Sequence, residues 1–306
     1  MNYDIIGDIH GHADKLEVLL QKLGYSHRNG AWRHPDRSAI FVGDFIDRGP
    51  GQLPTLKIVR GMMEAGSARA TMGNHEFNAI AWATPDPANE GLHLRPRHGE
   101  KGEKNRRQHE AFLKEVEADS KEHGGWIQWF YDLPLWIENP HFQVVHACWS
   151  PAHMDTLRPH LQSNNRITSE IVESASRRGT PFHDAIETVL KGVEVRLPDG
   201  YSFRDKDGHV RHEIRTKWWD PELATYQAAY MGPAGVDVPN IRIPNHQRLP
   251  EPDRPTFIGH YWLDGTMAPL SNRVACVDYS VAKGGPLAAY RFEGEKRLLK
   301  ENFVAT

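Results

Sequence analysis

A chain of 306 residues is long enough for one large or two average domains. Hydrophobic residues make up 39% and charged residues 25%, which is typical of globular proteins and excludes disordered or collagen-like chains. The formal charge of −3 provides no basic field for nonspecific binding to nucleic acid. No apolar run approaches the roughly 20 residues of a membrane span, and the first residues lack a basic, cleavable leader. We therefore expect a cytoplasmic protein without a membrane partner.

Three strand–helix units are expected in the first 83 residues. Short apolar runs at 3–6, 39–42 and 69–72 each end in a glycine that is followed by a polar residue. After each run, apolar residues recur at helical spacing, at about 16–23, 56–63 and 77–83. Strands that alternate with helices favour βαβ units in a largely parallel sheet.

The middle of the chain is less regular. Residues 95–107 contain six basic and two acidic side chains and lead into a polar helical stretch that reaches about residue 123. This segment is either a solvated insertion or a basic rim that steers an anionic substrate. Asp199-Gly200 and Asp207-Gly208 lie between alternating stretches and predict two hairpins. Further short strands are expected at 144–145, 256–258, 274–279 and 287–292.

Five predicted strands end in residues that can bind a metal ion. These residues are Asp8 with His10, Asp44, Asn74, His146 and His260. Ligands of open α/β sheets collect beyond the carboxyl ends of the strands, so we expect these side chains to converge on one crevice. The chain has 18 histidines and only two cysteines. Carboxylate, amide and imidazole donors without thiolates suit manganese, iron, zinc or nickel.

Local spacing supports a site for two ions. Asp8 and His10 are two residues apart on an extended segment, so both side chains can bind the same ion. Two ions need many ligand atoms, and Asp44 is the natural bridging carboxylate. Asn74 and His75 are adjacent and aimed differently, so the amide oxygen can bind metal while the imidazole faces substrate.

Three motifs, in this order, resemble the signatures of the phosphoprotein phosphatase branch of the calcineurin-like metallophosphoesterases. They are Gly7-Asp8-Ile9-His10-Gly11, Gly43-Asp44-Phe45-Ile46-Asp47-Arg48-Gly49 and Gly73-Asn74-His75-Glu76. Val145-His146-Ala147 and Gly259-His260 match the two later histidine motifs. The C-terminal stretch from Val277-Asp278-Tyr279 to Gly284-Gly285-Pro286-Leu287-Ala288 looks more like bacterial dinucleoside tetraphosphatases and related bacterial phosphatases.

The resemblance implies a four-layer α/β/β/α sandwich of two mixed sheets, with two divalent ions and manganese as the first choice. It implies a single metallophosphoesterase domain over residues 1–306, with insertions near 90–125 and 150–255. By position, the residues that resemble the ligands of one ion are Asp8, His10 and Asp44. Those that resemble the ligands of the other ion are Asp44, Asn74, His146 and His260.

Asp47, Arg48 and His75 look catalytic on the same grounds. Two cations would generate a bridging hydroxide, and Arg48 would bind two phosphate oxygens through its planar fork. His75 would protonate the leaving oxygen, while Asp47 holds its other ring nitrogen. Arg215 is a candidate second phosphate ligand, with an ordinary salt bridge as the alternative.

We therefore expect a metal-dependent phosphoesterase of the protein-phosphatase type. Hydrolysis of dinucleoside polyphosphates is the alternative, and a non-catalytic scaffold is a third reading. A scaffold could dispense with a proton donor and a phosphate-binding arginine, yet His75 and Arg48 accompany all six ligands. The expected partner is a phosphorylated substrate, which can be a phosphoprotein, a nucleotide or a small phosphate ester.

Overall fold

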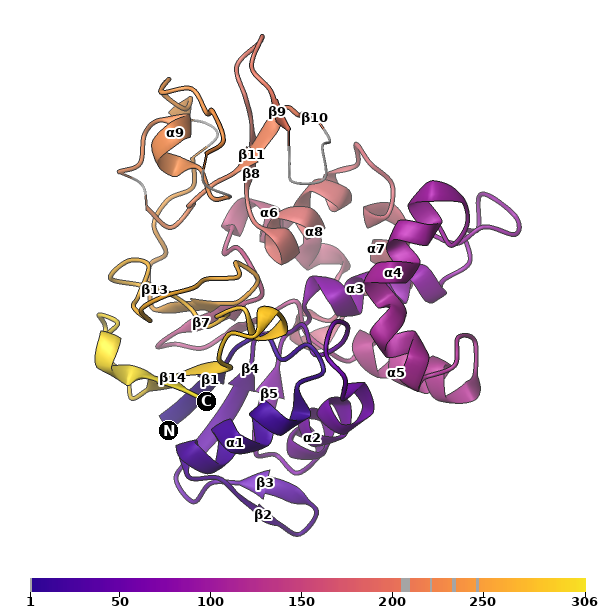
Figure 1. The fold of residues 1–306 in the computed structure, drawn as a ribbon, viewed down its shortest axis with the longest axis vertical. Coiled ribbons are helices and arrows are strands. Elements are labelled where there is room, and N and C mark those ends of the chain that lie inside the picture. The colour runs from indigo at the N-terminus through magenta and orange to yellow at the C-terminus, as the bar shows by residue number, and fades with distance from the viewer. Residues whose placement is uncertain (1, 205–209, 221, 233–234, 246–247) are drawn as a thin grey trace.

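The computed structural model describes residues 2–204, 210–220, 222–232, 235–245 and 248–306. Two mixed β-sheets form its centre, with helices on both sides and a further helical region beside them (Figure 1). None of the helices in the described ranges combines the length and the apolar character needed to cross a membrane.

The first sheet has the strand order β15-β14-β1-β4-β5. Its strands are β1 (Asn2–Ile6), β4 (Arg37–Phe41), β5 (Ala68–Ala70), β14 (Ala288–Phe292) and β15 (Phe303–Ala305). The strands β1, β4 and β5 are parallel, as the alternation of strands and helices predicts. The sheet is nevertheless mixed, because β14 runs antiparallel to both β1 and β15.

The second sheet has the order β13-β12-β7-β6. Its strands are β6 (Trp136–Glu138), β7 (Gln143–Val145), β12 (Thr256–Ile258) and β13 (Val274–Cys276). Three of them are parallel, and β6 runs antiparallel to β7. Each strand is only three residues long, and all of their residues except Glu138 are buried, which is typical of strands that are covered on both faces.

The two sheets pack face to face through alternate side chains of their strands. Ile5 and Ile40 of the first sheet lie in one buried cluster with Val144, Phe257 and Ala275 of the second. Successive residues of a strand point to opposite faces, so their neighbours in the chain face outward, against helices.

Helices cover both outer faces, which makes four layers. The helices α1 (Ala13–Leu23) and α2 (Gln52–Glu64) pack on the first sheet, and α6 (Pro151–Leu157) and α8 (Pro181–Lys191) pack on the second (Figure 1). The α/β/β/α sandwich that the sequence motifs imply is therefore confirmed.

A helical region extends beside the sandwich. It contains α3 (Asn74–Ala83), α4 (Gly99–Glu115), α5 (Lys121–Tyr131) and α7 (Ser169–Ala175). The remaining elements are short: β2 (Ser26–Arg28), β3 (Ala31–Arg33), the small helix α9 (Tyr226–Ala229) and several 3₁₀ turns. The polar stretch expected up to about residue 123 is indeed helical, but the helix is broken between α4 and α5.

The predicted pair of hairpins differs from the structure. The strand β8 (Glu194–Arg196) pairs with β11 (Glu213–Arg215), and β9 (Phe203–Arg204) pairs with β10 (Val210–Arg211) inside it. Asp199-Gly200 thus lies in a local turn within one nested hairpin and does not join two paired strands, because an Asp-Gly pair marks a turn without choosing the partner strand. Asp207-Gly208 lies outside the described residues.

Candidate metal centre

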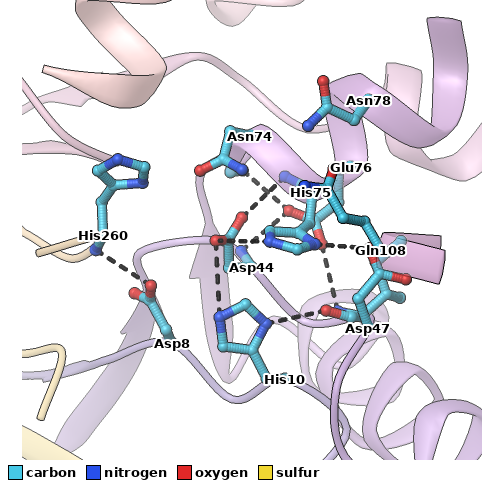
Figure 2. Close-up of polar contacts among 12 residues, drawn as sticks. Asp8, His10, Asp44, Asp47, Asn74, His75, Glu76, Asn78, Gln108 and His260 are labelled. Atoms are coloured by element: carbon cyan, nitrogen blue, oxygen red, sulfur yellow. Dashed lines mark hydrogen bonds and ion pairs between the residues drawn. The ribbon is translucent and has the colours of Figure 1, made fainter. Parts of the chain in front are cut away.

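The loops that follow the strands of both sheets meet at one place (Figure 2). The backbone N–H groups of Ile9 and His10 donate to the carbonyl of Asp44 at 3.1 and 2.9 Å, which ties the loops after β1 and β4 together. In the second sheet, the N–H of Gly259 donates to the carbonyl of His146 at 2.8 Å. The strand ends that carry the predicted ligands therefore do converge.

The carboxylate of Asp44 lies at the centre of this arrangement. Its Oδ2 is 3.8 Å from Nε2 of His10 and 3.3 Å from Nε2 of His146. Two buried groups have donor atoms within 4.8 Å of one another, and both include Asp44: one adds His10 and His75, and the other adds His146 and His260. Asp44 thus occupies the position in which a carboxylate can serve two ions.

Two further predicted ligands lie at the edges of these groups. Oδ1 of Asn74 is 3.3 Å from Nε2 of His146. Oδ2 of Asp8 accepts the backbone N–H of His260 at 3.0 Å, which leaves Oδ1 available. The structure places His75 rather than Asp8 in the tight group around His10.

Hydrogen bonds fix which imidazole nitrogens are available. Nδ1 of His10 donates to the carbonyl of Ile46 at 3.0 Å, and Nδ1 of His146 donates to the carbonyl of Val42 at 2.8 Å. Both rings therefore turn Nε2 toward the Asp44 carboxylate. Burial alone would lower the pKa of His146, but the charge and hydrogen bond of Asp44 outweigh it and raise this pKa to about 10, so this ring would have to release a proton to bind a metal ion. Burial, reinforced by the nearby His75, lowers the pKa of His10 to about 4, which keeps this imidazole neutral.

Several buried polar atoms of this cluster have no hydrogen-bond partner among the described residues. They are Oδ1 of Asp8, Nε2 of His10 and both ring nitrogens of His260. Buried polar atoms in folded proteins almost always have a partner. Divalent cations would satisfy Oδ1 of Asp8, Nε2 of His10 and one ring nitrogen of His260, so the residues present fit a metal centre.

Glu76 holds the loops in place and is a functional residue that the sequence reasoning passed over. Its buried carboxylate accepts the backbone N–H groups of Asp44, Phe45 and Gly73 at 2.8–2.9 Å. It thereby joins the loops after β4 and β5. Asp44 itself has a φ of 54°, a left-handed conformation that costs free energy for a side chain of this kind and needs such support.

His75 and Asp47 form a buried pair beside the metal-competent cluster. Nδ1 of His75 is 2.5 Å from Oδ2 of Asp47, and its Nε2 is 3.9 Å from Oδ2 of Asp44. Burial alone would lower the pKa of His75, but the charge of Asp44 and the hydrogen bond to Asp47 outweigh it, and the pKa is raised. A protonated imidazole held in this way can donate a proton from Nε2.

The two predicted phosphate-binding arginines have different surroundings. Arg48 is exposed, and its guanidinium carbon lies 5.6 Å from the ring centre of Trp262. Arg215 lies on β11, where Nη2 is 3.9 Å from Oε1 of its cross-strand neighbour Glu194. Its buried Nε has no hydrogen-bond partner among the described residues, and its charge adds to burial in lowering the pKa of His260. Arg215 is therefore close to the cluster and also near a carboxylate, so both interpretations stay open.

Half-buried Trp262 and exposed Lys283 complete a rim of the cluster that the sequence reasoning missed. The Trp262 ring lies 5.5 Å from the His10 ring, and Nζ of Lys283 lies 4.3 Å from the Trp262 ring centre. Asp278 holds the backbone here, because its Oδ2 accepts the N–H of Trp262 at 2.7 Å. The Gly259-His260 motif stops two residues before Trp262, so the motif itself gave no reason to single out this tryptophan.

The basic segment at 95–107 is partly turned inward. Arg95 donates to Oδ1 of Asn78 and to Oε1 of Gln108, both at 2.8 Å, which links α3 to α4. Arg97 binds Asp119 through two hydrogen bonds of 2.8 and 2.9 Å. The remaining basic residues of the segment are exposed: Lys101, Lys104, Arg106 and Arg107. The segment is therefore partly structural, and steering of substrate by its exposed residues stays a prediction.

A four-layer sandwich with carboxylate and histidine donors at its strand ends is the architecture of a metal-dependent hydrolase. A family model described as "Calcineurin-like phosphoesterase" matches residues 1–172, more than half of the chain. The chain belongs to this family, and membership implies divalent metal ions.

Curated relatives match a limited part of the chain. Two proteins named "Bis(5'-nucleosyl)-tetraphosphatase PrpE [asymmetrical]", from Halalkalibacterium halodurans and Bacillus subtilis, are each 46% identical over 76 residues. The matched part is 24% of this chain and 31% of each relative. A Saccharomyces cerevisiae protein serine/threonine phosphatase with similarity to human PP5 aligns over 100% of this chain and 79% of its own, with a TM-score of 0.50 and 15% identity. This last likeness shows the fold.

We expect Glu76→Gln to destabilise the protein by about 1–3 kcal/mol, because the amide NH₂ would face backbone N–H donors that now meet a carboxylate oxygen. Urea unfolding would measure the change. Glu64→Gln is a suitable control, since the Glu64 side chain is 64% exposed and its ion pair among the described residues is with Arg60, one turn earlier in the helix. A free energy of unfolding of Glu76→Gln equal to that of the control would contradict the role given to Glu76.

Proposed function

We propose that this chain hydrolyses phosphate esters at a site for two divalent ions centred on Asp44. The observation that carries the proposal is the pair of buried donor groups that share Asp44, directly beside the His75–Asp47 pair. The proposed ligands of one ion are Asp8, His10 and Asp44. The proposed ligands of the other ion are Asp44, Asn74, His146 and His260.

The donor chemistry supports manganese as the first choice, with iron, zinc or nickel as alternatives, because all donors are oxygen or imidazole nitrogen. When bound, two such cations supply Lewis acidity that makes water a usable nucleophile at neutral pH and neutralises charge on the phosphoryl oxygens. The side chains of the chain itself perform the remaining tasks: binding the phosphoryl group and delivering a proton.

Arg48 is the proposed phosphoryl ligand. Its guanidinium is exposed and makes no ion pair with a carboxylate among the described residues, so its donors remain available for two oxygens of one phosphoryl group. Arg215 is proposed as a second ligand, supported by the buried Nε that lacks a partner in the described chain. The guanidinium groups of Arg48 and Arg215 would both compensate the negative charge that spreads over the equatorial oxygens in the transition state.

His75 is the proposed proton donor to the leaving oxygen. Because Nδ1 is engaged by Asp47, the ring can deliver a proton only from Nε2, which faces the Asp44 side of the site. Asp47 stabilises the charged ring and sets its orientation. The reaction then needs no covalent phosphoenzyme.

Substrate class follows from what surrounds the reacting group. The motifs favour a protein-phosphatase-like substrate, a phosphoserine or phosphothreonine ester. A dinucleoside polyphosphate is a second candidate, and the rim of Arg48, Trp262 and Lys283 favours it. The positive side chains of Arg48 and Lys283 can bind phosphates, and the Trp262 ring beside them can stack on a base. The names of the curated relatives agree with this second candidate.

Metal content tests the bridging role of Asp44. Asp44→Asn should lower the occupancy of both ions, since a neutral amide binds divalent cations more weakly than a carboxylate, whereas His10→Ala should chiefly empty one. Elemental analysis of the dialysed proteins would report this. Asp36→Asn, at an exposed position, is the control. Unchanged metal in Asp44→Asn would refute the bridging assignment.

Leaving-group dependence tests the role of His75. His75→Asn should slow hydrolysis of an alkyl ester such as phosphoserine by on the order of 10²- to 10⁴-fold, because an alkoxide needs a proton to leave. A nitrophenolate leaves without one, so hydrolysis of nitrophenyl phosphate should fall clearly less. Steady-state rates on both esters, with metal content checked, give the ratio. Equal losses on both esters, with chemistry rate-limiting, would instead assign His75 to phosphoryl binding.

Substitution in the rim separates the two substrate classes. Lys283→Met should reduce kcat/KM for diadenosine tetraphosphate about tenfold, the loss expected for one charge-assisted contact, and should barely affect nitrophenyl phosphate. Lys300→Met replaces an exposed lysine of another segment and is the matched control. Equal effects of Lys283→Met on both substrates would remove the support for the polyphosphate candidate.

A further inference from the structure

The carboxylate of Asp47 has two histidine partners, and the motif accounts for only one of them. Oδ2 contacts Nδ1 of His75 at 2.5 Å, while Oδ1 contacts Nδ1 of His109 at 2.8 Å. His109 comes from α4, in the inserted helical region, 62 residues away from Asp47 in the chain. Both Asp47 and His109 are buried, with exposed fractions of 2% and 5%.

The direction of these hydrogen bonds follows from the charge state of Asp47. Burial alone would raise the pKa of Asp47, but the charge and hydrogen bond of His109, followed by those of His75, hold it well below its usual range. An ionised carboxylate only accepts hydrogen bonds, so both Nδ1 atoms act as donors. Each carboxylate oxygen thus has its own donor, and rotation of the carboxylate would break both bonds.

Among the described residues, the side chain of His109 has no hydrogen-bond partner other than Asp47. Its ring packs 5.7 Å from the ring of Trp82 and 5.1 Å from the ring of Phe112. Its Nε2 is buried and has no hydrogen bond within the described part of the chain. An apolar residue would fill such a pocket with less loss of hydration, so packing alone does not explain an imidazole here. The hydrogen bond to Asp47 is therefore the contact, among the described residues, that requires the N–H donor of an imidazole.

A second contact from α4 reaches the same loop. The carboxylate of Glu115 accepts the backbone N–H groups of Gln52 and Leu53, at the start of α2, at 2.7 and 2.9 Å. The Gln52 side chain in turn accepts the N–H of Asp47 at 2.6 Å. Asp47 has a φ of 70°, a left-handed conformation that the surrounding contacts must maintain. The inserted helix therefore supports both the backbone and the side chain of Asp47.

We infer that His109 is a positioning residue that holds Asp47 in the orientation that aims His75 at the leaving group. This inference rests on the proposed function, in which His75 delivers the proton. His109 does not touch the substrate in this arrangement, and it acts only through Asp47.

Three substitutions separate positioning from packing. His109→Leu fills the apolar space without a donor, with His109→Phe in reserve if the leucine variant does not fold. His109→Asn retains an N–H group in place of Nδ1 and can still donate to Asp47. His123→Leu is the matched control, since buried His123 packs against the same Trp82 and Phe112, at 6.1 and 5.9 Å, and makes no contact with Asp47 in the described structure.

The manganese-loaded enzymes are compared by kcat on phosphoserine and on nitrophenyl phosphate. His109→Leu should lower the ratio of the two rates at least about tenfold, because only the alkyl ester depends strongly on proton donation. His109→Asn should restore most of the ratio, and His123→Leu should leave it at the wild-type value. An equal loss on both esters, no rescue by asparagine, or the same shift in His123→Leu would overturn the inference.

A measurement without turnover keeps this test independent of the proposed function. In histidine labelled with ¹⁵N, the proton that His75 donates to Asp47 should give a strongly downfield signal. His109→Leu should shift or broaden that signal, and His109→Asn and His123→Leu should retain it. A signal that is unchanged in His109→Leu would refute positioning even if the wild-type protein hydrolysed neither ester. Inactivity of the wild type on every ester, with the signal changing as expected, would count against the proposed function alone.

Discussion

The candidate site depends on the hydrogen bonds that the buried carboxylate of Glu76 accepts. This carboxylate accepts N–H groups from Asp44, Phe45 and Gly73, so it joins the loops that follow two neighbouring parallel strands. Backbone donors at strand ends have no ladder partner, and a buried one is costly if it is left unpaired. One ionisable side chain at the start of α3 satisfies three of them. The same contacts orient Asp44, whose Oδ1 then accepts the N–H of His75 at 2.9 Å.

Near Glu76, several buried polar atoms have no hydrogen-bond partner in the part of the chain that the structure describes. The sheets contribute apolar cores on both faces, and the strand ends contribute these atoms of Asp8, His10 and His260. Such an arrangement is unfavourable for the folded chain alone and becomes favourable when cations bind it. Ions that bind only the folded state add to its stability by mass action.

The sequence predicts the parts of this fold that are encoded locally. Apolar runs that end in a glycine and a polar residue locate β1, β4 and β5, and the same positions carry the candidate ligands. The alternation of strands and helices did not reveal that β14 lies beside β1, because antiparallel pairing over such a separation depends on tertiary packing. The pairing of β8 with β11 escaped prediction for the same reason.

In the candidate site, too, the locally encoded residues could be predicted and the long-range contacts could not. Residues within the motifs could be named from the sequence, whereas His109 could not, since its polar partner lies 62 residues earlier. A weak signal was present: His109 and Phe112 are three residues apart and therefore share a helix face, with Glu115 one turn further on. Trp262 could not be singled out either, because a tryptophan after a strand most often packs in a core, whereas Trp262 is half-buried beside His10.

The position of β1 has a consequence for synthesis. This strand lies between β4, which begins at residue 37, and β14, which begins only at residue 288. On the ribosome, the half-sheet of β1, β4 and β5 can assemble early, but one edge of β1 stays open until β14 (Ala288–Phe292) has emerged. His260 also arrives late, so the nascent chain cannot complete its donor set before the second sheet forms. Folding of the two sheets and binding of metal are therefore expected to finish together, after His260 and β14 have been synthesised.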